Sequence, residues 1–441
     1  MSKARAALCL VLTITGAGPT LAQIPPADGR ESRRTPIVRV IEECRDAVVN
    51  ISTTQVRQLM DEMFDFGPFG GQQRVQSVGS GVVIHESGFI ITNAHVVARA
   101  SDVRVTFADK QAEPAEIFSV DAEHDLAVLK VNADRPLKAL KLGRSDDIMV
   151  GETVVAIGNP LGLQHSVTSG IVSAIDRDLR LNERVTYRGL IQTDTPINPG
   201  NSGGPLINVN SELIGINTAI RGDAQNVGFA IPVDRIWSLL PSLLDVEKRQ
   251  RVRFGVRVGG PEAIVQQVVA GSPAERAKLQ PKDRVVQLDG QPVRDAIDYY
   301  VKLLARQPGD AVKLALDRGG RTTSATLSLE PVPLPDGKKL AYELLGLDIG
   351  KLSDANRRRW ELPDDVALTV DGLERGGAAG QEGIQRGDLL LRINRSQVTN
   401  IADVGLALES ASPGDRVLVE GLRIRNGVLY SWWTVLTAQR P

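Results

Sequence analysis

A serine flanked by small residues stands near the middle of the 441-residue chain, in the stretch Gly200-Asn201-Ser202-Gly203-Gly204-Pro205. A serine hydroxyl becomes a strong nucleophile only when a neighbouring base removes its proton. Small neighbours let a substrate carbonyl approach, and they let two main-chain amides, those of Gly200 and Ser202, bind the oxyanion that forms. Taken alone the stretch could also be a turn, so acyl transfer at Ser202 requires a base and an orienting acid elsewhere.

Only four histidines are available as that base: His85, His95, His124 and His165. His95 follows a strand-like run that ends in small residues, which leave an imidazole room to face a cleft. Asp125 enters the apolar run at 126–129, where a desolvated orienting carboxylate should lie. We therefore predict His95 as the base and Asp125 as its partner. The chain order His, Asp, Ser is that of chymotrypsin and differs from the orders of subtilisin and the α/β-hydrolases.

The other three histidines have simpler interpretations. His124 is next to Asp125, and strand alternation directs it to the opposite face, so it is predicted to be non-catalytic. His85 is expected at a hairpin turn before Gly88, and His165 in a loop after Gly162. Both are expected to be exposed.

Several short motifs surround these residues, at 78–84, 92–97, 125–130, 156–160, 167–173, 198–204 and 228–232. Through them, residues 78–232 resemble the protease domain of the Deg/HtrA family of periplasmic serine endoproteases. The resemblance implies a mainly β fold, with a chymotrypsin-like pair of six-stranded barrels and the triad in the cleft between them. It also implies cleavage of unfolded proteins without ATP, and no metal or other cofactor.

The C-terminal part of the chain repeats. Asp283 is followed by Pro308-Gly309-Asp310, and Asp388 by Pro413-Gly414-Asp415, so that the paired aspartates are 27 residues apart in both copies. Equal spacing indicates two copies of one module. Both copies resemble PDZ domains, at 252–333 and 338–437, which add an extended peptide to a sheet edge and hold its terminal carboxylate on loop amides.

The predicted peptide-binding residues of the two modules are Phe254, Gly255 and Val256 in the first, and Leu345, Gly346 and Leu347 in the second. The first module departs from the family because Lys282 replaces a glycine and the segment after its Gly255 is shortened. The second carries 357–360, a basic run ending in tryptophan that is expected on a solvated helix face. A purely structural role for the second module is the alternative.

The N-terminus is predicted to be a signal peptide over residues 1–22. Lys3 and Arg5 precede a 12-residue apolar run, and small residues precede a cleavage site after Ala22. That run is too short to span a bilayer, although a retained interfacial anchor is the competing interpretation. Export leads to a periplasmic location. Cleavage removes Cys9 and leaves Cys44 alone, which excludes an intramolecular disulfide.

Length and composition suit an exported globular protein of about three domains. The net charge is −1, and no basic patch for nucleic acid is apparent. Residues 23–35 are polar and contain proline, as in a tether, and residues 36–245 form the protease domain, starting with helix-like spacing and a strand at 47–51. A polar linker over 247–253 follows the protease domain.

An unusual aromatic and glycine-rich stretch occupies 58–76. Such a stretch suggests contact with another subunit or cover for the active site, and the alternative is a loop packed on its own barrel. By resemblance the chain forms a homotrimer, and the short loop argues against larger resting assemblies.

The residues around the nucleophile also predict specificity and control. Apolar Ile197 and Val227 suggest a substrate pocket for small or medium aliphatic side chains, and no acid lies at the position that would select lysine or arginine. Asn201 cannot form the ion pair that activates digestive relatives, so control is assigned to loops at 175–189, 194–199 and 220–227. Arg177 matches the family's sensor-loop arginine.

These observations predict a serine endoprotease of protein quality control that binds unfolded substrates and peptide C-termini. Two alternatives remain at this point. One is a chaperone or peptide-binding scaffold with secondary proteolysis, and the other is a regulatory protease of a single envelope substrate.

Overall fold

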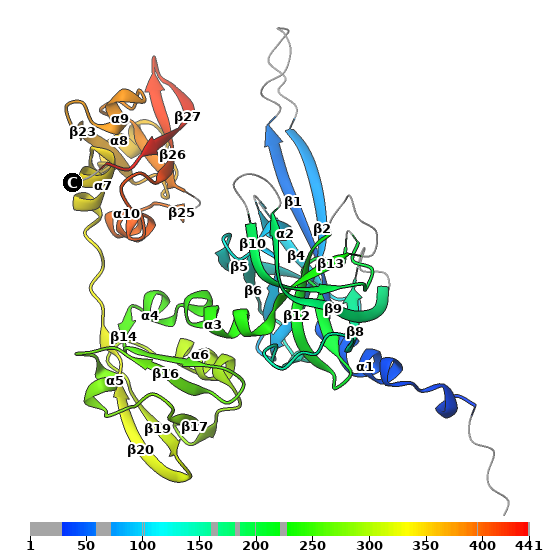
Figure 1. The fold of residues 1–441 in the computed structure, drawn as a ribbon. Coiled ribbons are helices and arrows are strands. Elements are labelled where there is room, and N and C mark those ends of the chain that lie inside the picture. Colours follow the sequence, from blue (N-terminus) through cyan, green and yellow to red (C-terminus); the bar gives the residue numbers. More distant parts are fainter. Residues whose placement is uncertain are drawn as a thin grey trace, which may run out of the picture. The chain divides into compact units, whose positions relative to one another are not determined.

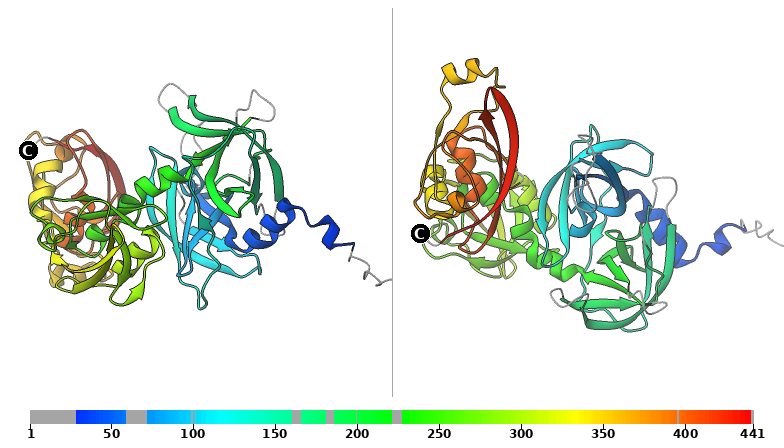
Figure 2. Two further views of the ribbon diagram at one scale, coloured as in Figure 1. Left: turned by 60° about the horizontal axis from the view of Figure 1, so that its bottom comes forward. Right: turned by 90° about the horizontal axis from the view of Figure 1, so that it is seen from above.

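The computed structural model describes residues 29–58, 72–98, 100, 102–159, 166–180, 186–198, 200–220, 227–394 and 396–439. Two compact units make up the chain (Figures 1 and 2). The first runs to Leu244 and includes Gly259–Ala263 and Arg294–Asp298, and the second holds the rest. The expected signal peptide, most of the 58–76 stretch and His165 lie outside the described residues.

The first unit begins with short helices that lead into a closed six-stranded barrel, ordered β1-β2-β3-β6-β5-β4. Its core is built from alternating apolar residues such as Val49, Ile51 and Ile90. The elements are η1 (Glu31–Arg33), α1 (Pro36–Cys44), η2 (Arg45–Ala47), β1 (Val48–Gln58), β2 (Gln72–His85), β3 (Phe89–Thr92), α2 (Ala94–Val97), β4 (Asp102–Thr106), β5 (Ala112–Asp121) and β6 (Leu126–Val131).

Helix α1 is the helix expected from the apolar spacing after residue 35. The side chain of Thr35 accepts from the amide of Val38, and Pro36 occupies the first turn, where its missing N–H costs nothing. Val40 and Cys44 are buried on its inner face. The chain then enters β1 at Val48, within the predicted strand.

A second barrel follows in the order β11-β8-β9-β10-β13-β12, and a pairing between β11 and β12 closes the ring. Buried Val154, Leu206 and Ile214 lie in its core. The elements are β7 (Lys141–Leu142), β8 (Thr153–Gly158), β9 (Ser166–Arg180), β10 (Thr186–Thr193), β11 (Pro205–Asn208), β12 (Glu212–Ile220) and β13 (Gly228–Pro232), and then α3 (Val233–Leu244).

The first repeat has a sheet ordered β15-β16-β17-β19-β20, which leaves β15 at an edge. The expected linker before it holds a helical turn, α4, capped by the side chain of Asp245. The elements are α4 (Val246–Arg249), β14 (Val252–Arg253), β15 (Val256–Gly259), β16 (Ile264–Val268), α5 (Pro273–Arg276), β17 (Arg284–Leu288), β18 (Gln291–Pro292), α6 (Ala296–Leu304), β19 (Ala311–Arg318), β20 (Arg321–Ser328) and β21 (Glu330–Pro331).

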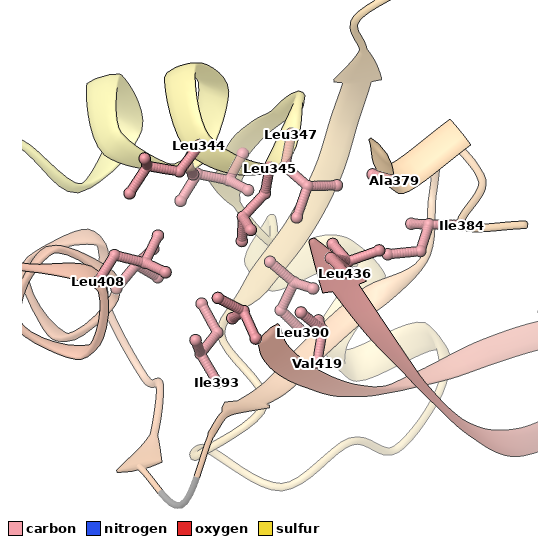
Figure 3. Close-up of a cluster of buried hydrophobic side chains, with 14 of the residues drawn as sticks. Leu344, Leu345, Leu347, Ala379, Ile384, Leu390, Ile393, Leu408, Val419 and Leu436 are labelled. Atoms are coloured by element: carbon pink, nitrogen blue, oxygen red, sulfur yellow. The ribbon is translucent and has the colours of Figure 1, made fainter. Parts of the chain in front are cut away.

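The second repeat has the matching sheet order β22-β23-β24-β26-β27. Its core gathers leucines from α7, α10 and the strands around Leu390 (Figure 3). The elements are α7 (Gly337–Leu345), β22 (Leu347–Lys351), α8 (Asp354–Arg359), β23 (Leu368–Leu373), α9 (Ala378–Gln381), β24 (Leu389–Ile393), β25 (Ser396–Gln397), α10 (Ile401–Leu408), β26 (Arg416–Arg425) and β27 (Val428–Thr437). The basic run at 357–359 lies in α8, as expected.

One internal ion pair is present in both repeats. In the first, Arg318 Nε donates to Asp283 Oδ1 at 2.6 Å, and in the second Arg423 Nε donates to Asp388 Oδ1 at 2.7 Å. Both aspartates are buried. Each arginine also donates to a main-chain carbonyl 40 residues earlier in the chain. The same hydrogen bonds occur at equivalent positions in both repeats, which indicates that the two modules share one fold.

Candidate active site

His95 and Asp125 meet where the first barrel faces the second. His95 lies in the short helix α2, and Asp125 lies directly before β6 in the left-handed conformation, with φ of 55°. Asp125 Oδ2 accepts from His95 Nδ1 at 2.8 Å, and its Oδ1 accepts from the His95 amide at 3.0 Å. The Asp125 side chain is 2% exposed and that of His95 is 49% exposed. This arrangement fixes the ring and leaves Nε2 as its basic nitrogen.

Thr218 makes a second contact with the same carboxylate. Its hydroxyl donates to Asp125 Oδ2 at 2.6 Å, and it is buried in β12. A buried carboxylate needs hydrogen-bond donors to offset the loss of water, and Thr218 supplies one besides the two from His95. The sequence analysis did not assign Thr218, because nothing in an alternating strand marks one threonine for this contact.

Ser202 lies in the turn between the second barrel's β10 and β11. Its Oγ donates to the main-chain oxygen of Thr218 at 3.3 Å, which is a long bond. A cavity of about 210 Å³ opens over these groups, lined by His95, Gly200, Ser202 and Thr218 among others. His95 and Ser202 therefore line one opening. Thr218 accepts from Ser202 Oγ through its main-chain oxygen and donates to the buried Asp125 through its hydroxyl.

The turn around Ser202 is held from behind by Ser80 of β2, which is fully buried. The Ser80 amide donates to the Ser202 carbonyl at 2.9 Å, and the Ser80 hydroxyl donates to the Gly200 carbonyl at 2.5 Å. The hydroxyl also accepts from the amide of Asn159 at 2.9 Å. Ser80 thus fixes the carbonyls of both residues whose amides were predicted to bind the oxyanion.

Close packing explains the glycine after the nucleophile. Gly203 has φ of +81°, and a Cβ there would lie 2.2 Å from Thr92 Oγ1 and 2.3 Å from the Ser80 carbonyl oxygen. Neither atom can retreat, because Thr92 Oγ1 itself donates to that carbonyl at 2.7 Å. Only glycine satisfies both the left-handed backbone and this contact.

Comparisons with known proteins agree with this geometry. Residues 79–216 match the trypsin-like peptidase domain family, and residues 243–329 and 338–420 each match the PDZ domain family. A probable periplasmic serine endoprotease DegP-like of Pseudomonas fluorescens is 34% identical, over 87% of this chain and 90% of the relative. The chain belongs to the Deg/HtrA family.

Other members of the Deg/HtrA family are similar over comparable lengths. The periplasmic pH-dependent serine endoprotease DegQ of Escherichia coli is 31% identical, over 90% of this chain and 92% of that protein. A solved structure described as HtrA-type protease AlgW with tripeptide is 33% identical and covers 68% of this chain and 99% of its own, with a TM-score of 0.41. The matched domain families and the similar proteases show that this Deg/HtrA member is a serine protease with a trypsin-like peptidase domain followed by two PDZ domains.

The predicted substrate pocket is only partly described. Ile197 is 5% exposed and packs in the core of the second barrel. A Cβ on Gly228 would lie 2.6 Å from Ile197 Cγ1, so the two residues are in contact distance, and Val227 before it is half-buried. Asp194, near the start of the same loop, is exposed, and its Oδ1 accepts from the amide of Ile171 at 2.7 Å.

Arg177, the predicted sensor, is an exposed residue of β9 that pairs with Leu190 of β10. The middle of its loop, residues 181–185, lies outside the described residues. Of the other control segments, Pro199 and residues 221–226 also lie outside them. No helix among the described residues is long and apolar enough to cross a membrane.

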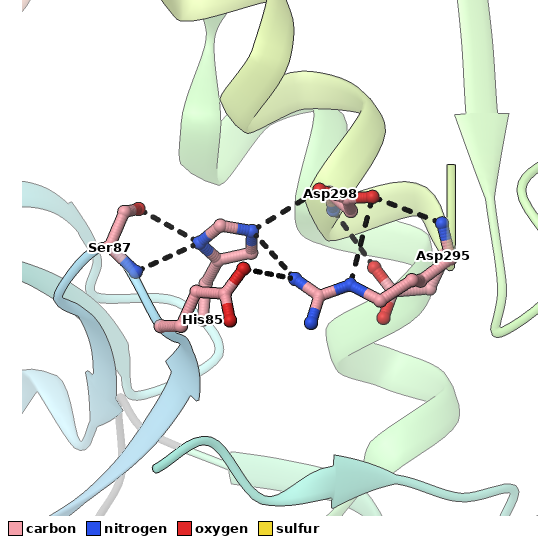
Figure 4. Close-up of polar contacts among 6 residues, drawn as sticks. His85, Ser87, Asp295 and Asp298 are labelled. Carbon is pink, nitrogen blue, oxygen red and sulfur yellow. Dashed lines mark hydrogen bonds and ion pairs between the residues drawn. The ribbon is translucent and has the colours of Figure 1, made fainter. Parts of the chain in front are cut away.

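The remaining described histidines are placed away from Ser202. His124 Nδ1 lies 2.9 Å from Asp121 Oδ2, as a half-buried pair. The expectation that His85 is exposed is wrong, because its exposed fraction is 6%. His85 Nε2 lies 3.4 Å from Asp298 Oδ1 and accepts from Arg294 Nη2 at 3.1 Å, while Ser87 covers Nδ1 (Figure 4). A segment distant in sequence thus covers the predicted turn, which local sequence cannot indicate.

The predicted peptide-binding loops have different surroundings in the two PDZ domains. In the first, the amides of Phe254 and Gly255 donate to the side chain of Glu247. In the second, the amide of Gly346 donates to the carbonyls of Ala341 and Tyr342 and ends helix α7. Val256 begins the edge strand β15, and Leu345 and Leu347 are fully buried.

Proposed function

We propose that this Deg/HtrA protease cleaves unfolded proteins by acyl transfer to Ser202. His95 takes the Ser202 proton and later gives it to the leaving amine, and Asp125 holds the imidazole in the required tautomer. The amides of Gly200 and Ser202 bind the oxyanion. The observation that carries this assignment is the bidentate contact of buried Asp125 with His95 beside the cavity that Ser202 lines.

The resting hydrogen bond of Ser202 bears on how the reaction starts. Its Oγ donates to Thr218, so the hydroxyl must turn toward His95 Nε2 before proton transfer. Catalytic hydrogen bonds of this kind are often long in ligand-free enzymes and tighten when substrate binds. This favours activation by ordering of the loops that contain Arg177 and the residues flanking 221–226, through a peptide bound to a PDZ domain.

Cleavage is proposed to follow small or medium aliphatic residues. Ile197, in the core of the second barrel, packs against Gly228, and Val227 is half-buried next to Gly228 in the chain. These apolar residues are proposed to form the pocket for the substrate side chain. Aliphatic side chains are buried in folded proteins, and such a pocket therefore selects unfolded chains. Relatives named as periplasmic proteins support a periplasmic location after signal cleavage, and the family resemblance supports a homotrimer.

The deciding experiment measures degradation of β-casein and of a folded control protein by the wild type and by Ser202→Ala. We expect the wild type to degrade casein without ATP and to spare the folded control, and Ser202→Ala to be inactive. Cleavage that persisted in Ser202→Ala would overturn the assignment of the nucleophile. Suppression of aggregation and heat survival that were fully retained by Ser202→Ala would instead favour the chaperone role.

A further inference from the structure

The side-chain carboxylate of Glu247 is bound to the predicted peptide-binding loop of the first PDZ domain. Glu247 Oε1 accepts from the amide of Phe254 at 2.6 Å and from the amide of Gly255 at 2.8 Å. Glu247 belongs to α4, only seven residues before Phe254. Two adjacent amides on one carboxylate oxygen are the contacts that a loop of this kind makes with the C-terminus of a bound peptide.

The loop is shaped to present those amides. Gly255 has φ of +69°, and a Cβ there would lie 2.2 Å from Ser272 Cβ, so the position requires glycine. The loop carbonyls point the other way: Phe254 O accepts from the amide of Ala274, and Gly255 O from the amide of Val269. Because both carbonyls are hydrogen-bonded, the loop is held rigidly. The amides of Phe254 and Gly255 both donate to Glu247.

A second side chain occupies the edge strand beside this loop. Strand β15 is the sheet edge to which a peptide would add, and the amide of Val258 donates to the hydroxyl of Tyr300 in α6 at 2.9 Å. In strand addition that amide is a donor for the peptide backbone. Tyr300 is 2% exposed and burial raises its pKa, so it remains a neutral hydroxyl there.

We propose that Glu247 is an internal ligand of the first PDZ domain, and that a peptide with a free C-terminal carboxylate binds there only after displacing it. The inference rests on the proposed binding of peptides by the PDZ domains and adds a way in which that binding is regulated. Because the binding-competent form is then a minor fraction of the domain, the apparent affinity for peptide is lowered by that fraction. Removal of Glu247 or of the Tyr300 hydroxyl therefore tightens binding.

The test uses the full chain with Ser202→Ala, so that the probe is not cleaved. The probe is a fluorescein-labelled decapeptide ending in Ala-Val-Val with a free carboxylate and a photo-crosslinking residue, and the same peptide as its C-terminal amide is the control ligand. Fluorescence anisotropy gives Kd, and mass spectrometry locates the crosslinks. Glu247→Ala and Tyr300→Phe are the test variants, and Glu262→Ala removes an exposed acid of the same domain as the matched control.

We expect Glu247→Ala to lower Kd at least tenfold for the carboxylate peptide and not for the amide, with new crosslinks on residues 256–259. Tyr300→Phe should lower Kd less, and Glu262→Ala should leave it unchanged. An unchanged or higher Kd in Glu247→Ala, or tightening with crosslinks elsewhere, would overturn the inference. If Glu247→Ala does not fold, Glu247→Leu, which also lacks an acceptor, decides in the same way. Casein degradation by the wild type is independent of every one of these outcomes.

Discussion

The turn around Ser202 and the first PDZ domain each contain a pair of main-chain amides that is proposed to bind a negatively charged oxygen, and the surroundings of the two pairs differ. In the turn, buried Ser80 bonds the carbonyls of Gly200 and Ser202 and leaves their amides to the proposed oxyanion. In the PDZ domain, Glu247 sits directly on the amides of Phe254 and Gly255.

The difference follows from what each pair must bind. An oxyanion exists only during the reaction, so its donors must be rigid in advance and free of any other ligand. A peptide carboxylate is permanent, and donors for it can be shared with an internal competitor that sets the threshold for binding. In the proposed function, rigidity of Gly200 and Ser202 serves catalysis, and competition for Phe254 and Gly255 serves control.

The largest effect is expected from Asp125, which is proposed to orient the catalytic base His95. Asp125→Asn should keep the fold but lower kcat by about 10⁴, because the amide stabilises the wrong tautomer of His95. The measurement is hydrolysis of a chromogenic peptide, and Asp109→Asn, at an exposed ion pair with Arg135, is the matched control. A loss below about tenfold would show that Asp125 does not orient the base.

A smaller effect is expected from removing the Ser80 hydroxyl, which holds the Gly200 carbonyl. Ser80→Ala leaves the Gly200 carbonyl and the Asn159 amide without their shared partner, and we expect kcat to fall on the order of 10-fold to 100-fold, less than the loss of a direct oxyanion donor. KM should change little, and Ki for a peptide boronate should rise in parallel with the fall in kcat.

Rates in that experiment are expressed per titrated active site, so that unfolded enzyme does not count. Thr53→Val is the matched control, since it removes another buried hydroxyl of the same barrel. A Ser80→Ala enzyme with fewer active sites but a normal rate per site would mean that Ser80 only supports folding.

The ion pair that occurs in both PDZ domains is expected to contribute to the stability of each domain. Asp388→Asn breaks the contact of a 2% exposed aspartate with Arg423, whose side chain is 19% exposed. We expect the second domain to lose about 2 kcal/mol, less than a fully buried pair because the arginine is partly solvated. Hydrogen exchange of β24 and β26 measures the loss, and peptide hydrolysis by the protease domain should stay within twofold.

The last prediction concerns Cys44, whose protection reports whether a variant of the protease domain has kept its first barrel. Burial raises the pKa of the Cys44 thiol to about 11, so at pH 8 it is almost entirely protonated. A thiolate is the reactive form, and we expect alkylation of the folded wild type to be at least about 100-fold slower than in urea. A variant with normal Cys44 protection has kept its first barrel, whereas rapid alkylation of the wild type at pH 8 would contradict the burial.

The sequence could predict residues of a rare type when the proposed chemistry requires that type. Four histidines and one small-residue turn led to His95, Asp125 and Ser202. In the structure His95 and Ser202 line one cavity, and Asp125 is hydrogen-bonded to His95. Equal spacing led to the two repeats, which share the Asp283 and Asp388 ion pairs. In each case a chemical requirement or a repeat narrowed the choice.

The residues that were missed are common types whose roles arise from packing. Ser80 and Thr218 have ordinary neighbours, and only the meeting of distant strands gives their hydroxyls partners. Glu247 stood in a polar stretch that indicated a linker, and its binding to a loop depends on the turn of α4. His85 became buried because residues 294–298 cover it, over 200 positions later in the chain.

The bond from Ser80 to the catalytic turn joins the two barrels, because Ser80 belongs to the first and Gly200 to the second. Synthesis makes the first barrel before the second, so the Ser80 hydroxyl can bond to Gly200 only after the residues of the second barrel have been made. The turn that carries the proposed nucleophile is therefore held in place only when both barrels are present.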